Sequence, residues 1–260
     1  MRTALCIVEK ELLELWRSPL LVASMVTLPA TVVTMPIALL AWLSHAAPEQ
    51  AVDFLRELYG VPAAASRAAA LAAVLAKNWL PMFLVLPIFL PILIAAQSIG
   101  GERERRTLEP LLATPVSTLS IIAGKSIAAV VPSLAITWVS ALAFCGGMDL
   151  IVWPELHALL LPDGAWLFGT LVLCPLLALF GNAAAVVVSS RVLDPRAAQN
   201  IAAMTVVPLL GVLVVQLAGR ATLSARFYGT FAVCAAAADV ALIAVAVRLF
   251  DREALLTRTR

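Results

Sequence analysis

The residue types that most often perform chemistry are scarce in this sequence and stand apart from one another. The four cysteines and two histidines are Cys6, Cys145, Cys174, Cys234, His45 and His157. The cysteines show no CxxC or CxxH spacing, so the sequence predicts neither a metal site nor a redox pair. Neither HExxH nor GxSxG is present, and the sequence therefore predicts no catalytic residue of a hydrolase.

One short motif superficially suggests phosphate binding. Gly124-Lys125-Ser126 has the ending of a P-loop, whose first glycine would then fall at position 119. That position is Leu119, and no predicted strand precedes the segment, so a nucleotide-binding loop is not expected here. Any ATPase that works with this chain must be a separate protein.

The strongest concentration of charge lies in residues 100–117. The i,i+4 pair Glu102 and Arg106 predicts a solvated helix, and Pro110 is expected to start a second, short helix that ends before Pro115. The apolar side chains of this segment are Leu108, Leu111 and Leu112. A brief apolar helix beside a charged one could enter a groove of another protein; the alternative is a solvated loop.

The elements that carry these residues are long apolar helices. Apolar residues make up 62% of the 260 positions and charged ones 13%, with a mean hydropathy of +1.00. Six stretches are long enough to cross a bilayer, and their continuous rather than alternating hydrophobicity excludes strands. We predict an all-α polytopic membrane protein, a single transmembrane domain over 1–260 with spans at 20–44, 80–99, 126–144, 165–190, 201–217 and 227–247.

Basic residues indicate how these spans are oriented. If both termini are cytoplasmic, thirteen of the eighteen Lys and Arg residues lie inside and five outside, as the positive-inside rule requires. We therefore expect a multi-pass protein of the cell inner (cytoplasmic) membrane. Residues 100–125 are then a cytoplasmic segment, and 46–77 an external loop with helical stretches at 51–59 and 63–76. The net charge of +2 is too small to suggest nucleic acid as a partner.

The first 18 residues form a predicted amphipathic helix. Its apolar face consists of Leu5, Val8, Leu12, Leu15 and Trp16, and its polar face of Arg2, Glu9, Lys10, Glu14 and Arg17. Pro19 should end this helix and begin the first span. We expect an elbow helix lying in the membrane surface; the alternative is a soluble tail helix.

Polar side chains within the spans are candidates for a transport path. Asp239 is the one charged residue inside a predicted span, and an unpaired carboxylate there is costly. Asn182, Gln97 and Gln216 are weaker candidates, since such side chains often only hydrogen-bond neighbouring helices. Asp239 could likewise serve a structural hydrogen bond.

At residues 102–117 the sequence resembles a known family. The pattern Glu-Arg-Glu-x-x-Thr-Leu-Glu-x-Leu-Leu-x-Thr-Pro-Val-Ser is similar to the segment that marks membrane subunits of ABC-2 type transporters, in particular sodium-efflux-type and multidrug-type permeases. The N-terminal Glu9-Lys10-Glu11-Leu12, the Gly124-Lys125 pair and the closing 248–253 segment are also similar. Arg106 departs from the family, which commonly has glycine there.

The resemblance implies a fold and a division of labour. It implies an ABC-2 exporter-like fold with an elbow helix, six spans and a coupling helix that contacts an ATP-binding subunit. The coupling residues it implies are Glu102, Arg105, Thr107, Leu108, Glu109, Leu111, Leu112 and Thr114. ATP and Mg²⁺ would bind only in the partner, and a second copy or a homologous permease would complete the membrane unit.

The mostly apolar spans favour export of a hydrophobic or amphipathic substrate. Two other classes compete with this interpretation. A membrane-embedded enzyme lacks the motifs it would need. An ion-coupled secondary transporter or channel would work without an ATPase and would usually carry more charge within its spans.

Overall fold

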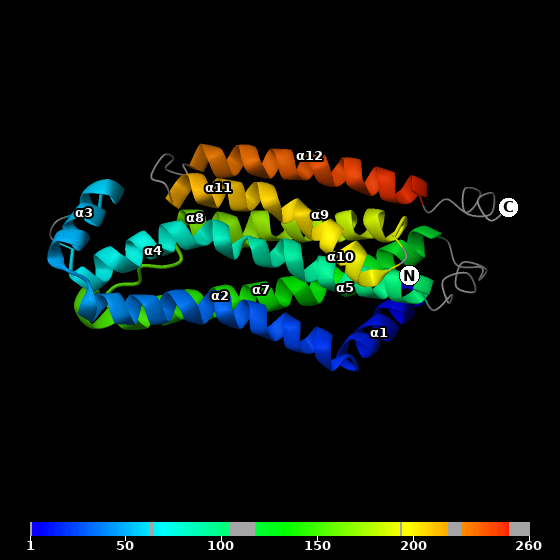
Figure 1. Cartoon of the computed structure of the whole chain (residues 1–260), viewed down its shortest axis with the longest axis horizontal. Helices are drawn as coiled ribbons and strands as arrows, with labels where there is room; N and C mark the ends of the chain where they lie inside the picture. The colour runs from blue at the N-terminus through cyan, green and yellow to red at the C-terminus, as the bar shows by residue number, and fades with distance from the viewer. Residues whose placement is uncertain (1, 63–64, 105–117, 193, 218–224, 250–260) are drawn as a thin grey trace.

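The computed structural model describes residues 2–62, 65–104, 118–192, 194–217 and 225–249, and these form helices joined by short connections, with no strand among them. The helices pack lengthwise into one elongated bundle (Figure 1). Six helical stretches are long and apolar enough to span a membrane: Pro19–Ala46, Arg67–Ser98, Ser120–Glu155, Gly164–Ser189, Pro195–Val214 and Arg226–Leu249. The prediction of an all-α fold with six spans is confirmed.

The chain begins with a helical elbow. Helix α1 (Arg2–Trp16) is followed by a sharp turn into α2 (Pro19–Ala46), and α1 slants across the end of the bundle (Figure 1). Ser18 is extended, and Pro19 occupies the first helical turn, where a missing N–H costs nothing. The proline thus separates the two helices at the predicted position. We call this end of the bundle the α1 end.

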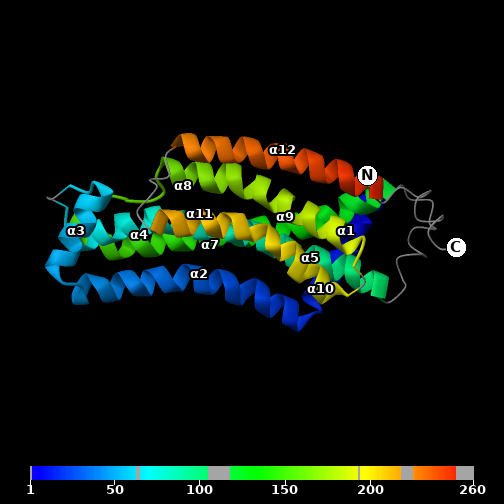
Figure 2. The same ribbon diagram turned by 45° about the horizontal axis from the view of Figure 1, so that its top comes forward.

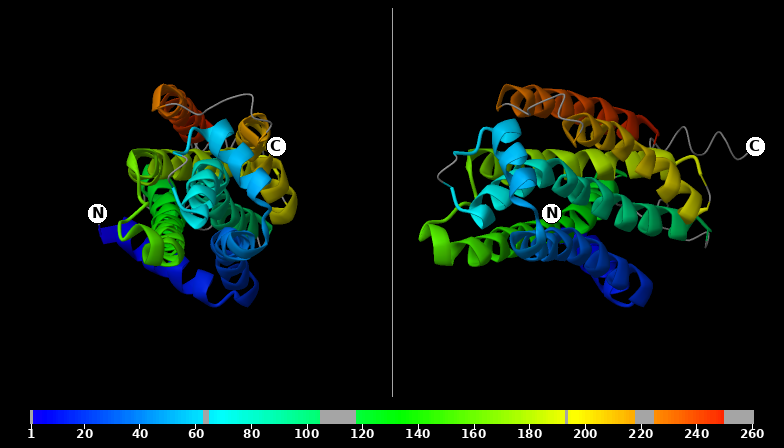
Figure 3. Two further views of the ribbon diagram at one scale, coloured as in Figure 1. Left: turned by 90° about the vertical axis from the view of Figure 1, so that its left-hand side faces the viewer. Right: turned by 60° about the vertical axis from the view of Figure 1, so that its left-hand side comes forward.

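The second span is the centre of the bundle. Helix α3 (Glu49–Tyr59) ends at Gly60, whose φ of 66° permits the turn; α4 (Arg67–Phe83) and α5 (Val85–Glu104) then follow nearly continuously. In the span Arg67–Ser98, 78% of the most apolar window is buried, against 22% in Pro19–Ala46. Figure 3 shows α4 surrounded by the other helices.

The alanine-rich stretch 63–76 was predicted to be a helix within an external loop, and the structure differs from that prediction in one respect. It is helical from Arg67 onward, but Ala68 to Ala72 are buried within the bundle rather than lying in an external loop. Small side chains and the absence of charge between Arg67 and Lys77 allow this stretch to serve as the first turns of the central span.

The remaining helices complete the bundle. They are α7 (Thr118–Leu156), α8 (Gly164–Phe168), a π-helical turn (Gly169–Leu173), α9 (Cys174–Ser189), α10 (Pro195–Ala203), a 3-10 turn (Met204–Val206), α11 (Val207–Leu217) and α12 (Ala225–Leu249). Helix α7 is twelve residues longer at its end than the predicted span 126–144. Figure 2 shows α12 running beside α8 and α9.

Close helix contacts hold the centre together. Helix α9 crosses α5 at Gly181, where an added Cβ would collide with the backbone carbonyl of Ile88. Toward the opposite end, Trp166 stacks on Phe144 at a centroid distance of 4.7 Å and also contacts Phe83. Its indole Nε1 donates to the Ala76 carbonyl at 3.2 Å. These contacts join α4, α5, α7, α8 and α9 at the centre of the bundle.

Candidate functional site: an ion cluster at the α1 end

Four charged side chains from three helices meet at the α1 end. Lys125 Nζ lies 2.6 Å from Glu11 Oε1 and 2.9 Å from Glu102 Oε2, and it donates to Ser98 Oγ at 2.9 Å. Lys10 Nζ lies 2.6 Å from Glu102 Oε1. We call Lys10, Glu11, Glu102 and Lys125 the ion cluster. Two positive and two negative charges make it formally neutral.

The positions of these residues give the cluster its significance. Lys10 and Glu11 belong to α1, Glu102 to the last turn of α5, and Lys125 to the beginning of α7. The segment 105–117, the middle of the predicted coupling segment 100–125, connects α5 to α7. The ion cluster therefore ties the elbow helix to both helices that flank this segment.

The cluster is shielded from water at its centre. The side chains of Lys125 and Glu11 are only 4% and 5% exposed, whereas Lys10 is 45% exposed at the edge. A buried pair contributes to stability only when further hydrogen bonds satisfy its remaining polar atoms. Lys125, with two carboxylates and a hydroxyl within 2.9 Å, meets that condition.

The charges of the ion cluster shift the pKa values of Glu11 and Lys10. Burial by itself would raise the pKa of Glu11, but the charge and hydrogen bond of Lys125, with smaller effects of Ser98 and Lys10, hold this pKa below its ordinary value. Partial burial opposes the charge of Lys10, yet the hydrogen bond to Glu102 and the nearby carboxylates raise the pKa of Lys10. Both residues are thus held in their charged forms around neutral pH.

The sequence analysis anticipated only part of this arrangement. Glu102 was expected on a solvated helix, paired with Arg106; instead it is buried and bound by two lysines, because α1 packs along α7 and brings Lys10 close to Lys125 and Glu102. Glu11 and Lys125 were named only within short motifs, and no contact or role was predicted for either. A signal existed for Glu11, which stands one helical turn before the apolar Leu15 and so shares its face.

One part of the apolar face of α1 packs against the protein, and another part is exposed. Leu15 is buried, and Val8 and Leu12 are half-buried. Trp16 is 72% exposed and so projects away from the protein, as an indole at a membrane surface would. The side chain of Leu5 lies outside the description.

All of the predicted coupling residues except Glu102 belong to the segment 105–117. Arg105, Thr107, Leu108, Glu109, Leu111, Leu112 and Thr114 lie outside the described residues, as does the predicted short helix 110–114. Glu102 is the one member of the set whose contacts the structure gives.

The predicted transport-path residues are dispersed over the bundle. Asp239 in α12 is 5% exposed, and neither carboxylate oxygen has a hydrogen-bond partner among the residues that the structure describes. Asn182 in α9 donates to Ser126 Oγ of α7 at 2.8 Å. Gln97 is half-buried in α5. Gln216 belongs to α11, and its side chain falls outside the description.

Asp239 is also not the only charged residue within a helical span. Asp149 lies in α7, beyond the end of the predicted span, and is buried. Its Oδ1 accepts hydrogen bonds from the backbone N–H groups of Leu160 and Leu161 at 2.9 and 3.1 Å. The two buried aspartates thus differ: Asp149 anchors a returning loop, whereas Asp239 has no such role among the described contacts.

Comparison with known proteins is consistent with this architecture. Residues 5–253 match a family described as ABC-2 family transporter protein. The match covers most of α1, the ion cluster, the segment 105–117 and all six spans. No curated protein matches the chain.

Proposed function

Because the chain belongs to the ABC-2 family of transporter proteins, we propose that it is the permease subunit of an ATP-driven exporter. A separate nucleotide-binding subunit supplies ATP hydrolysis, with ATP and Mg²⁺ bound there. The segment 105–117 is the contact with that subunit and lies on the cytoplasmic side. Both termini face the cytoplasm, and the protein resides in the inner membrane.

The ion cluster is the observation that carries this proposal. A segment that transmits force must be joined firmly to the helices that move, and 105–117 is flanked by Glu102 on one side and Lys125 on the other. Both residues bind α1, through Lys10 and Glu11. A displacement of the segment would therefore reach the elbow, and through it α2, together with the central span.

The route of this motion follows from the packing. Helix α5 is continuous with α4 except at the turn around Leu84, so a push on its end acts on the most buried span. Helix α1 leads into α2, the long peripheral span. ATP-driven closure of two partner subunits would thus shift a central and a peripheral helix together, opening a path to one side or the other.

The composition of the bundle supports a hydrophobic or amphipathic substrate. Among the described residues, the buried charged groups at the α1 end are neutralised within the ion cluster, and only Asp149 and Asp239 are buried and charged elsewhere in the spans. A second copy of this chain or a homologous permease would complete the path. Asp239, Asn182, Gln97 and Gln216 remain candidates for residues along it.

Affinity purification from mild-detergent membranes, with mass spectrometry of the co-purified proteins, tests the proposal. We expect a roughly stoichiometric protein with a Walker A sequence. Replacing Leu108, Leu111 and Leu112 with Asp should release it, whereas Leu159→Asp in an exposed loop at the opposite end should not.

A contrary result would favour a different class of transporter. If the chain purifies alone under conditions that preserve other ABC complexes, and transports after reconstitution without ATP, an ion-coupled transporter becomes the better hypothesis. Asp239 would then be the first residue to substitute.

A further inference from the structure

Asp239 stands in the middle of the buried face of α12. This face consists of Tyr228, Ala232, Ala235, Asp239 and Ala246, which follow one another at helical spacing. The rest of this peripheral helix is mostly exposed, since only 22% of its most apolar window is buried. Asp239 itself is 5% exposed, so its side chain is turned toward the protein rather than toward the membrane.

The buried face of α12 lies against α9, and both helices run toward the α1 end (Figure 2). Val186 of α9 and Ala246 of α12 pack together near that end. Asn182 precedes Val186 by one turn and therefore lies on the same face of α9. Asp239 precedes Ala246 by two turns, so its height along the contact differs from that of Asn182 by about 4.5 Å at 1.5 Å per residue. The two polar residues thus belong to the same stretch of the contact between α9 and α12.

Both residues carry acceptor atoms that lack a donor. Neither carboxylate oxygen of Asp239 has a hydrogen-bond partner among the described residues, and the same is true of Asn182 Oδ1. Asn182, which is 4% exposed, uses its Nδ2 to donate to Ser126 Oγ of α7. Three oxygen acceptors therefore lie in a buried contact that offers them no donor.

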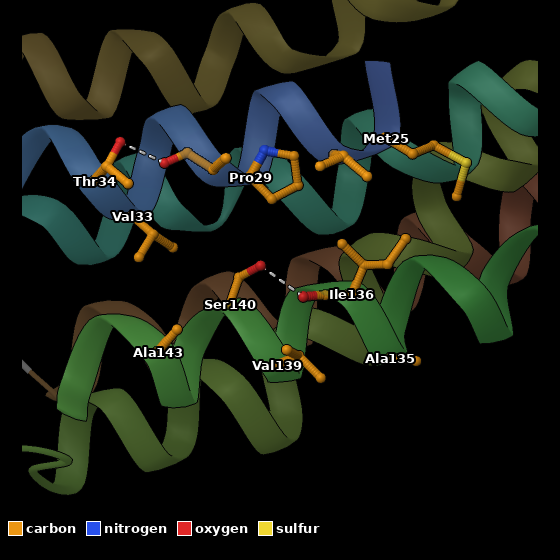
Figure 4. A pocket seen from close by; sticks show the side chains of 11 residues that line it. Met25, Pro29, Val33, Thr34, Ala135, Ile136, Val139, Ser140 and Ala143 are labelled. Atoms are coloured by element: carbon orange, nitrogen blue, oxygen red, sulfur yellow. Dashed lines mark hydrogen bonds between the residues drawn. The ribbon is translucent and has the colours of Figure 1, made fainter. Parts of the chain in front are cut away.

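Other polar side chains in the spans are satisfied by their own helices. Thr34 Oγ1 donates to the Ala30 carbonyl and Ser140 Oγ to the Ile136 carbonyl, each at 2.7 Å (Figure 4). A hydroxyl group can do this because it carries a proton, whereas an ionised carboxylate has none to donate. The N–H groups within a helix are already bound to backbone carbonyls, so α12 cannot satisfy an ionised Asp239 by itself.

Among the described residues, no positive charge is placed to neutralise Asp239 across this contact. The charged and titratable residues of α9, of the π-helical turn and of α12 itself are Cys174, Arg226, Tyr228, Cys234 and Arg248. The nearer arginine, Arg248, stands nine positions along the helix, which is about 14 Å at 1.5 Å per residue. Lys125 of α7 is bound to Glu11 and Glu102.

We propose that Asp239 binds a proton and shares it with Asn182, so that the two residues form a proton-binding site inside the contact between α9 and α12. A protonated carboxyl group supplies the donor that the contact lacks, because its O–H can donate to Asn182 Oδ1. The proton also removes a charge whose burial is costly. It can pass to water only when α12 moves away from α9. Its presence therefore favours the packed position of α12, and its loss favours separation of the two helices.

Infrared spectroscopy of the full chain in lipid nanodiscs tests this site without any ATPase partner. A protonated carboxyl group has a C=O stretching band at a frequency where carboxylates do not absorb. At neutral pH, the spectrum of the wild type minus that of Asp239→Asn should contain this carboxylic acid band. Asp149→Asn is the matched control, because Asp149 is buried but accepts two backbone N–H bonds, which favour the ionised form. Its difference spectrum should contain carboxylate bands instead.

Two further substitutions test whether the proton is shared with Asn182. Asn182→Leu removes the acceptor and should shift the acid band to higher frequency, because the C=O stretching frequency rises when the O–H group of the acid loses its hydrogen bond. Ser126→Ala removes the partner of Asn182 Nδ2 but keeps Oδ1, so the band should stay in place. A cooperative melting transition of each variant shows that it folds.

Two outcomes would contradict the proposal. If the difference between wild type and Asp239→Asn contains carboxylate bands and no acid band, Asp239 is ionised and the site holds no proton. An acid band that does not respond to Asn182→Leu would exclude the sharing with Asn182. Neither result concerns the ATP-binding partner, so a failure here is distinct from a failure of the proposed function.

Discussion

Lys125 Nζ lies 2.6 Å from Glu11 Oε1, although the two residues are 114 positions apart in the sequence. This pair joins the elbow helix to the helix that follows the predicted coupling segment. Both side chains are almost completely buried, so the contact is isolated from competing water and salt. It is the innermost link of the ion cluster.

Removal of the Lys125 charge should destabilise the protein strongly. In Lys125→Met, Glu11 and Glu102 remain at a buried site with only the partly exposed Lys10 as a counter-charge. Breaking a buried ion pair in this way costs about 3–5 kcal/mol. Thermal unfolding in detergent should show a clearly lower melting temperature.

Two variants separate the specific contact from a general effect of charge. Arg191→Met, at an exposed position of the α1 end, should melt like the wild type. The double variant Glu11→Gln with Lys125→Met should melt above Lys125→Met, because the buried site then no longer holds the unpaired carboxylate of Glu11. A double variant that melts no higher than Lys125→Met would argue against a direct interaction.

The stabilising effect of Glu11 should depend on pH. Because its pKa is lower in the folded protein, its contribution is complete above about pH 4.3, the ordinary value for Glu, and is lost as the pH falls through the folded-state value. The melting-temperature difference between wild type and Glu11→Gln should be constant from about pH 5 to about pH 8 and shrink below about pH 4. A difference that vanishes already near neutral pH would contradict the lowered pKa.

The crossing of α5 and α9 should tolerate no side chain at position 181. Gly181→Ala places a methyl group against the Ile88 carbonyl, and overpacking of this kind costs about 1–3 kcal/mol. Gly146→Ala in α7 is the matched control, since its added Cβ meets nothing within 4 Å. Equal melting temperatures for the two variants would show that the helices can separate there without cost.

Asp239 should affect transport more than stability. Its carboxylate has no hydrogen-bond partner among the described residues, so Asp239→Asn breaks no contact that the structure contains and should not lower the melting temperature. We expect reduced ATP-dependent efflux from reconstituted vesicles, because a charged group in a span is rarely retained without a role. Asp149→Asn, which weakens the loop anchor at Leu160 and Leu161, should instead lower the melting temperature.

Hydrophobicity and helix-ending residues predicted much of the fold. Apart from Asp239 in the sixth, the predicted spans carry no charge, and a bilayer forces such a segment to satisfy its backbone hydrogen bonds within a helix. The elbow turn followed from Pro19 alone. The resemblance in the segment 102–117 indicated the family, which the match over residues 5–253 confirms.

The sequence by itself thus determined how many times the chain crosses the membrane, which depends on local composition, and which family it belongs to, which the motif at 102–117 indicates. Only the tertiary structure decided that α4 and α5 are central, that Glu102 is buried and that Glu11 and Lys125 meet. These outcomes depend on contacts between segments about a hundred residues apart. Such contacts form only where the surfaces of two helices fit together. Hydropathy cannot report them, since a lysine bound to two carboxylates and a lysine in water have the same hydropathy in a sequence.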